Sequence, residues 1–163
     1  MNKRFIAPLG IGLIVIAIAI AGVFWMQKGA HVELKGSILK VRTQPLDENS
    51  SVAVIDFRFA NPSDYPFIVR TVSISMDDAS GKTYEASTVS DVDAKRLFQY
   101  LPLLGQKYND SLLARDKIGP RQSWDRMIAA RFEVPVGLLD ARKKLTVRIE
   151  DVDGPVSELT ENK

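Results

Sequence analysis

An uncharged run near the N-terminus, residues 5–26, constrains this chain more than any other feature of its sequence. The run reads FIAPLGIGLIVIAIAIAGVFWM and contains no charged side chain over its 22 positions. At a rise of about 1.5 Å per residue, a helix of this length measures about 33 Å, and a bilayer's hydrocarbon core is about 30 Å thick. The run therefore predicts one transmembrane helix, with Trp25 near the headgroups. Its representative membrane-anchor residues are Phe5, Ile14, Ile18 and Trp25.

A cleaved signal peptide is the alternative interpretation of the same run. Lys3 and Arg4 resemble a charged n-region, and small residues within 17–21 could supply a cleavage site. The apolar run continues beyond them through residues 22–25 without a polar region, which favours an uncleaved anchor. The chain contains no cysteine, so attachment of a lipoprotein-type lipid is excluded.

The charges beside the run favour a cytoplasmic N-terminus. Lys3 and Arg4 precede it, and long downstream domains cross the membrane largely regardless of their charge. We therefore expect a short cytoplasmic tail at residues 1–4, the helix at 5–26 and a stalk at 27–30. The expected location is the cell membrane, in single-pass form. The C-terminal domain is then extracytoplasmic, and periplasmic in a Gram-negative cell.

The balance of charges argues against a nucleic-acid-binding domain. The chain has 22 Lys and Arg and 20 Asp and Glu, and Lys3 and Arg4 lie before the apolar run. The part after residue 26 therefore carries 20 basic and 20 acidic side chains. A neutral domain lacks the basic surface on which nucleic-acid binding depends.

Alternating patterns predict that the rest of the chain is mainly β. Residues 51–60 place Ala53, Ile55, Phe57 and Phe59 on one face, and Asp56 with Arg58 falls on the other. Similar runs are expected at 31–42, 67–76, 82–89, 112–118, 124–134 and 145–149. About seven short strands separated by turns are typical of an antiparallel immunoglobulin-like β-sandwich. We expect this domain over residues 31–153, with a flexible tail at 154–163.

The stretch FRFANPSDYPF predicts a corner between two strands. Asn61 and Pro62 are favoured at the start of a tight turn, and Pro62 has no N–H with which to extend a ladder. Pro66 then stands where the next strand begins. Backbone geometry accounts for these three residues, which we interpret as structural turn residues.

A short helix and loop are expected to interrupt the strands at about residues 90–110. The residues Ser90 to Asp93 fit a capping box, and Pro102 should end the helix. The insertion holds more apolar side chains than a free loop needs, so it either covers part of the sandwich or binds a partner or the membrane. The candidate partner-binding residues are Leu97, Phe98, Tyr100, Leu101, Leu104 and Tyr108.

The chain resembles a known group of sandwiches in three stretches: FRFANPSDYPF, VSISMDDASG and IGPRQSWDRMIAARFEVP. In this order they are similar to the late-embryogenesis-abundant, water-stress-and-hypersensitive-response domain, and to bacterial membrane-anchored immunoglobulin-like domains of unknown function. The resemblance covers about residues 32–152. It implies an immunoglobulin-type β-sandwich and no catalytic residues.

No grouping of residues points to catalysis or to a metal. His31 is the only histidine and has no companion at ligand spacing, and neither a nucleophile elbow nor a phosphate loop is present. Paired aspartates such as Asp151 and Asp153 lack the spacing of a calcium loop and suit turns. We expect no cofactor, no metal and no catalytic residue, and the sequence leaves a small-molecule ligand open.

These features favour a non-catalytic, membrane-anchored interaction or accessory module of the cell envelope with a protein partner. The alternative is an envelope protein that protects against desiccation or osmotic stress, by analogy with the water-stress domain. An enzyme is the least favoured class, because the convergent polar groups of an active site are not visible.

Overall fold

The computed structural model describes Gly12, residues 14–22 and residues 33–162, and its contacts divide the chain into two units, Met1–His31 and Val32–Lys163. Residues 14–22 are helical, and within them the side chains of Ile14 and Ile18 are exposed. Phe5 and Trp25 lie outside the described residues. Over the described ranges, no helix has the length and apolar character needed to cross a membrane.

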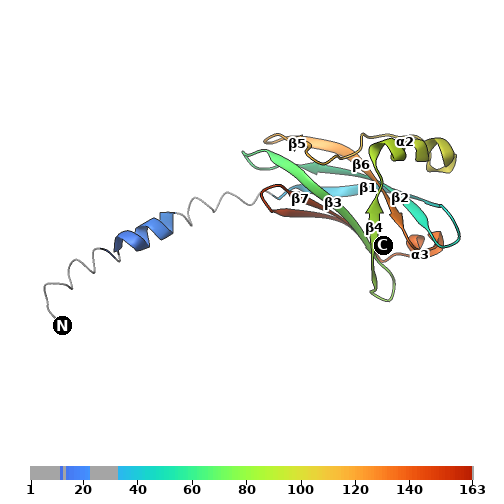
Figure 1. Ribbon diagram of the computed structural model, residues 1–163, viewed down its shortest axis with the longest axis horizontal. Coiled ribbons are helices and arrows are strands. Elements are labelled where there is room, and N and C mark those ends of the chain that lie inside the picture. Colours follow the sequence, from blue (N-terminus) through green and yellow to red (C-terminus); the bar gives the residue numbers. More distant parts are fainter. Residues whose placement is uncertain (1–11, 13, 23–32, 163) are drawn as a thin grey trace. The chain divides into compact units, whose positions relative to one another are not determined.

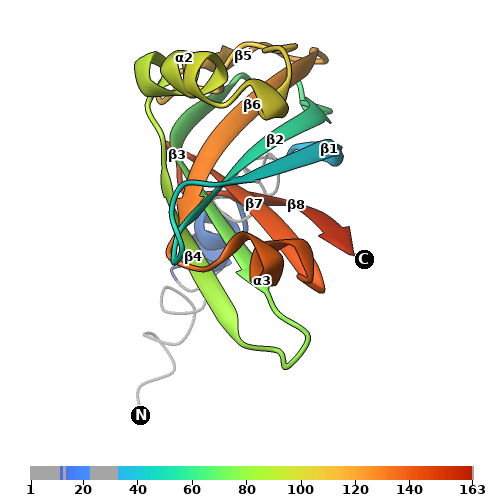
Figure 2. The same ribbon diagram turned by 90° about the vertical axis from the view of Figure 1, so that its right-hand side faces the viewer.

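The second unit is mainly β, as predicted, with eight strands over residues 33–162 (Figures 1 and 2). All pairings between these strands are antiparallel. The strands are β1 (Lys35–Pro45), β2 (Ser51–Ala60), β3 (Phe67–Asp77), β4 (Thr83–Thr88), β5 (Lys117–Ile118), β6 (Ser123–Phe132), β7 (Lys144–Asp151) and β8 (Val156–Asn162). The helical segments are α2 (Asp91–Tyr100), the 3-10 turn η1 (Pro102–Leu104) and α3 (Val136–Asp140).

The strands follow one path, β1-β2-β6-β4-β3-β7-β8, that folds over into a near-closed sandwich. Strand β4 joins the two layers, because Ala86 pairs with Ile74 of β3 and Ser87 pairs with Arg131 of β6. Strand β5 adds to the start of β3.

The main core lies between the layers and follows the alternation in the sequence. On β2, Ala53, Ile55, Phe57 and Phe59 are all fully buried in it, as predicted. Partners from the other layer include Ile74, Met76, Leu145, Val147 and Ile149. Burial of so many large apolar side chains is the main stabilising contribution to the sandwich.

Two expected segments differ in the structure. Of the strand expected at residues 112–118, only Lys117–Ile118 pairs as a strand. Residues 110–112 make only an isolated bridge to Met127 of β6, and residues 113–116 form a turn. The tail expected to be flexible instead contains β8, which pairs with β7 throughout. Ser157 and Leu159 of β8 face inward and are buried, and Ser157 Oγ accepts a hydrogen bond from Leu34 N at 2.8 Å.

Candidate functional site

The insertion begins where the capping pattern predicts. Ser90 Oγ accepts a hydrogen bond from Asp93 N at 3.2 Å and donates one to the Asp93 carboxylate at 2.7 Å, which satisfies an otherwise free N–H of the first turn. Helix α2 ends at Tyr100, and Pro102 then opens η1. Pro102 cannot continue an α-helix because its ring removes the N–H and clashes with the preceding turn.

A second apolar cluster lies on the outer face of the sheet, beneath the insertion. Val52 and Val54 of β2 and Met127 and Ala129 of β6 form its floor, and Ala94 of α2 packs on them; all five are almost fully buried. Figure 2 shows α2 beside the outer face of β6. Four of the sequence-predicted candidates pack into this cluster, namely Leu97, Phe98, Leu101 and Leu104. These four residues therefore attach the insertion to the sandwich.

The remaining two candidates are exposed. The side chains of Tyr100 and Tyr108 have exposed fractions of 79% and 64%, and the neighbouring Leu103 reaches 84%. We call Tyr100, Leu103 and Tyr108 the insertion patch. Leu103 lies in the predicted insertion but was not among the candidate partner-binding residues, because Leu101, Leu103 and Leu104 are alike in the sequence and give no sign of which one turns outward.

A buried ion pair fixes the loop that follows η1. Arg42 Nη2 lies 2.7 Å from Asp56 Oδ2, and both side chains are more than nine-tenths buried. Arg42 Nη1 also donates to the carbonyl oxygens of Leu104 and Gln106 at 2.6 and 2.7 Å. Asn109 Nδ2 donates to Asp56 Oδ1 at 2.8 Å. These hydrogen bonds to both Arg42 Nη atoms and both Asp56 oxygens offset part of the cost of removing two charges from water.

Aromatic rings complete the surroundings of this arginine. The guanidinium of Arg42 lies 5.3 Å from the ring centroid of Phe98 and 5.1 Å from that of Tyr108. Lys40 Nζ lies 5.8 Å from the centroid of the Tyr108 ring, so two cations lie within cation–π distance of Tyr108. Nothing in the sequence pattern singled out Arg42, and Asp56 was predicted to lie on the face opposite to the core. One sign in the sequence that Asp56 is covered is that it shares its face of the strand with the apolar Val52 and Val54.

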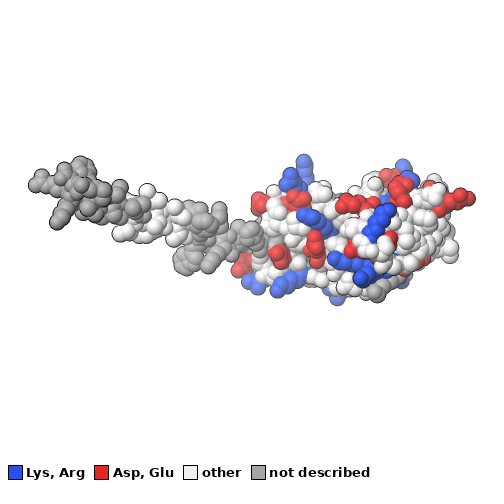
Figure 3. Space-filling view, turned by 90° about the horizontal axis from the view of Figure 1, so that it is seen from below, with Lys and Arg blue, Asp and Glu red and all other residues white. Residues whose placement is uncertain are grey.

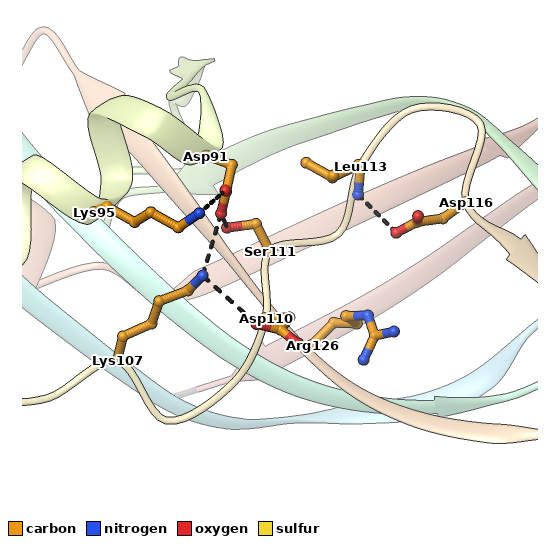
Figure 4. Close-up of a pocket in the computed structure, with 8 residues that line it drawn as sticks. All are labelled: Asp91, Lys95, Lys107, Asp110, Ser111, Leu113, Asp116 and Arg126. Atoms are coloured by element: carbon orange, nitrogen blue, oxygen red, sulfur yellow. Dashed lines mark hydrogen bonds and ion pairs between the residues drawn. The ribbon is translucent and has the colours of Figure 1, made fainter.

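A charged pocket of about 250 Å³ lies at the N-terminal end of α2 (Figure 4). Its lining carries three acids, three bases, one hydroxyl and one apolar side chain. They are Asp91, Asp110, Asp116, Lys95, Lys107, Arg126, Ser111 and Leu113. The equal numbers of both signs leave no net charge with which to attract a strongly ionic ligand.

Asp91 is the centre of the pocket's hydrogen bonds. Its carboxylate receives Lys95 Nζ at 2.7 Å, Ser111 Oγ at 2.6 Å and Lys107 Nζ at 3.2 Å. These three donors hold the pKa of Asp91 well below its usual range, and the same pairing raises the pKa of Lys95. An aspartate saturated with donors stays ionised and is a weak base, so the cluster ties α2 to the loop rather than supplying acid–base chemistry at neutral pH.

The predicted turn residues lie away from the insertion. Asn61 is buried and donates from Nδ2 to the carbonyl oxygens of Tyr65 at 2.7 Å and Gly119 at 3.2 Å, while its Oδ1 accepts from Ser63 N at 3.0 Å. Pro62 and Pro66 flank the turn and are exposed. The corner between β2 and β3 was predicted, whereas the bond from Asn61 to the segment before β6 was not.

Within residues 12, 14–22 and 33–162, no group of three or more histidine, cysteine or acidic side chains could hold a metal ion. His31 lies outside the described residues. The calcium candidates Asp151 and Asp153 belong to a turn, in which Asp151 Oδ1 accepts a hydrogen bond from Asp153 N at 3.2 Å.

Comparison with known proteins found distant structural likenesses. No family model matches the chain, and no curated protein matches it significantly. An ApaG protein from Pseudomonas aeruginosa is 9% identical, with 71% of this chain and 92% of that chain covered and a TM-score of 0.37. An uncharacterised β-sandwich protein from Clostridium difficile is also 9% identical, with coverages of 80% and 86% and a TM-score of 0.42. The archaellum periplasmic stator protein FlaG from Sulfolobus acidocaldarius is 9% identical, with coverages of 78% and 99% and a TM-score of 0.34.

Proposed function

We propose that this chain is a membrane-anchored, extracytoplasmic β-sandwich that acts as a non-catalytic interaction module of the cell envelope. The apolar run at residues 5–26 supports the anchor, and its described residues 14–22 are helical. The observation that carries the interaction role is the insertion patch. Tyr100, Leu103 and Tyr108 are exposed on a segment that the buried Arg42–Asp56 pair holds in place.

A fixed exposed patch suits recognition because its residues lose little conformational freedom when a partner binds. Tyrosine is among the side chains that most often dominate the binding energy of protein interfaces. Lys40 lies beside Tyr108, so the partner surface we propose has an apolar pocket for the patch and acidic groups at its rim.

Photo-cross-linking in the native membrane tests this proposal. A photoreactive residue in place of Leu103 should give one stoichiometric adduct, whereas the same residue at the exposed Glu85 of β4 should give none. Tyr100→Asp and Leu103→Asp should weaken recovery of the partner. Val92→Asp, on the same helix at a position 59% exposed, should not. Recovery of the monomer alone in mild detergent, with no adduct from position 103, would contradict the proposal.

Envelope stress protection is the second candidate function, and the resemblance to the water-stress domain is its only support. It predicts that cells lacking the protein become sensitive to drying or salt, with no fixed partner. If the Tyr100→Asp and Leu103→Asp variants fully restore stress tolerance to cells that lack the protein, this alternative is favoured.

A further inference from the structure

Two arginines in the segment before β6 have a backbone conformation that suits glycine. Among the described residues, Arg115 (φ 70°) and Arg121 (φ 58°) are the non-glycine residues with positive φ. Each occupies the third position of a tight turn. Asp116 N donates to Leu113 O at 3.2 Å in the first turn, and Gln122 N donates to Gly119 O at 3.3 Å in the second. This is the type II pattern, whose third position favours glycine.

The repeated use of arginine at a strained position points to a role outside the fold, because an ordinary side chain there costs stability. Glycine would relieve the strain at both positions, and it would remove both guanidinium groups. The exposed Lys117 lies between the two arginines in the chain. This set of Arg115, Lys117 and Arg121 is named the arginine loop.

The arginine loop is held firmly against the sandwich. Arg115 N donates to Val69 O at 2.7 Å, and Asp116 Oδ2 accepts from Leu113 N at 2.9 Å. Asn61 N donates to Gln122 O at 2.8 Å, and Asn61 Nδ2 donates to Gly119 O at 3.2 Å. Both turns therefore present their arginines from a fixed backbone.

The arginine loop lies at the end of the sandwich where the chain enters it. Lys35, at the start of β1, pairs with Ala60 of β2, and Ala60 pairs with Ser123 of β6. Ser123 comes directly after the second of the two turns, so that turn and the start of β1 lie at the same end of the sandwich. Figure 1 shows β5 and α2 toward opposite ends of the sandwich. Eight residues, 27–34, separate the apolar run from β1, and eight residues span at most about 28 Å. In an anchored chain, this linker would let the end of the sandwich that carries the arginine loop lie no more than about 28 Å from the end of the apolar run.

The charges of the loop are available to a new partner. Over residues 33–162, the side chains of Arg115 and Lys117 have no ion-pair partner. Arg121 contacts Asp64 at 2.9 Å, but both side chains are mostly exposed, and such pairs exchange readily. Figure 3 shows acids and bases interspersed on the face of the sandwich that it displays.

We infer that Arg115, Lys117 and Arg121 bind the phosphates of anionic lipid headgroups and so orient the domain on its own membrane. Guanidinium groups bind phosphate through paired hydrogen bonds, and a cation near an anionic leaflet gains attraction from its surface potential. In this orientation the insertion patch, near the other end of the sandwich, stays free for a protein partner. The inference rests on the membrane anchor of the proposed function.

The test uses the full chain in vesicles of phosphatidylcholine, with and without phosphatidylglycerol. Because the chain has no cysteine, Ala114→Cys provides one exposed site for a spin label. Collisions of this label with a headgroup-bound paramagnetic nickel lipid should increase when phosphatidylglycerol is present. The increase should shrink at high salt. Arg115→Gly and Arg121→Gly should each lower the docked-to-free ratio by about fivefold, since one cation near the surface is worth about a factor of five.

The glycine variants separate binding from folding, because glycine fits both backbone positions and should leave the melting temperature unchanged or higher. Lys82→Gln and Lys143→Gln, made singly, each remove one charge at the opposite end of β3, and each should leave the label signal unchanged. Two results would overturn the lipid-binding inference: equal label collisions in both kinds of vesicle, or glycine variants that dock as well as the parent. If the chain still floats with the vesicles in these experiments, the membrane anchor stands. A chain that does not float with either vesicle would overturn the anchor as well.

Discussion

The Arg42 guanidinium and the Asp56 carboxylate form a 2.7 Å ion pair between β1 and β2, on the outer face of the sheet rather than in the main core. The insertion covers this pair from above, and its loop supplies Leu104 O, Gln106 O and Asn109 Nδ2 as further partners. Arg42 Nε is buried without a hydrogen-bond partner. The pair therefore serves less to strengthen the sheet than to define where the insertion lies.

Asp56→Ala should destabilise the fold by about 3–5 kcal/mol, because it leaves the Arg42 charge buried and unpaired. Urea denaturation of the full chain in mild detergent, followed by circular dichroism, measures the effect. The control is Arg58→Ala, which removes the exposed pair with Asp125 and should change the unfolding midpoint little. Similar midpoints for both variants would contradict the structural role of the buried pair.

Leu104→Ala should cost about 2–5 kcal/mol, because it leaves a cavity in the cluster beneath the insertion. The adjacent Leu103→Ala should stay within about 0.5 kcal/mol, since its side chain is 84% exposed. The two variants remove the same atoms from neighbouring positions, so burial is the difference between them. Thermal unfolding compares them directly, and the reverse order would mean that the insertion packs differently.

Gly36→Ala should destabilise the pairing of β1 with β2 by about 1–3 kcal/mol. An added methyl group would overlap the carbonyl oxygen of Arg58 and lie 2.7 Å from the Phe59 Cα, and neither backbone atom can move away easily. Gly137→Ala in α3 is the matched control, because nothing lies within 4 Å of the added atom. The control should be neutral or slightly stabilising, as alanine favours helix.

Asp91→Asn should lower the free energy of unfolding at neutral pH, with a loss that vanishes in acid. The donors around Asp91 depress its folded pKa, so its contribution is fully present above its unfolded pKa of about 3.9. The contribution declines as the pH falls from there toward the lower folded pKa. Melting temperatures of parent and variant should therefore converge as the pH drops below about 4. A constant difference down to strong acid would show that ionisation of Asp91 is not the cause.

The alternating runs were sufficient to predict most strands. Residues 51–60 were expected as a strand and form β2 with the same bounds, and the capping pattern at Ser90 located the start of α2. The strand β8 was missed because Ser157 and Leu159 are its only buried residues, and two inward positions in a polar segment resemble a tail.

Most strands and the start of helix α2 could thus be predicted from the sequence, since the alternation of side chains and helix capping depend on neighbours a few residues away. The contacts between side chains on the outer face of the sheet could not be predicted from the sequence. Arg42 and Asp56 lie 14 residues apart, and Asn109 is 53 residues beyond Asp56, so their meeting depends on strand pairing and on the insertion folding back. The same long-range packing decides that Leu104 is buried and Leu103 exposed, because burial of a side chain depends on which distant segment covers it.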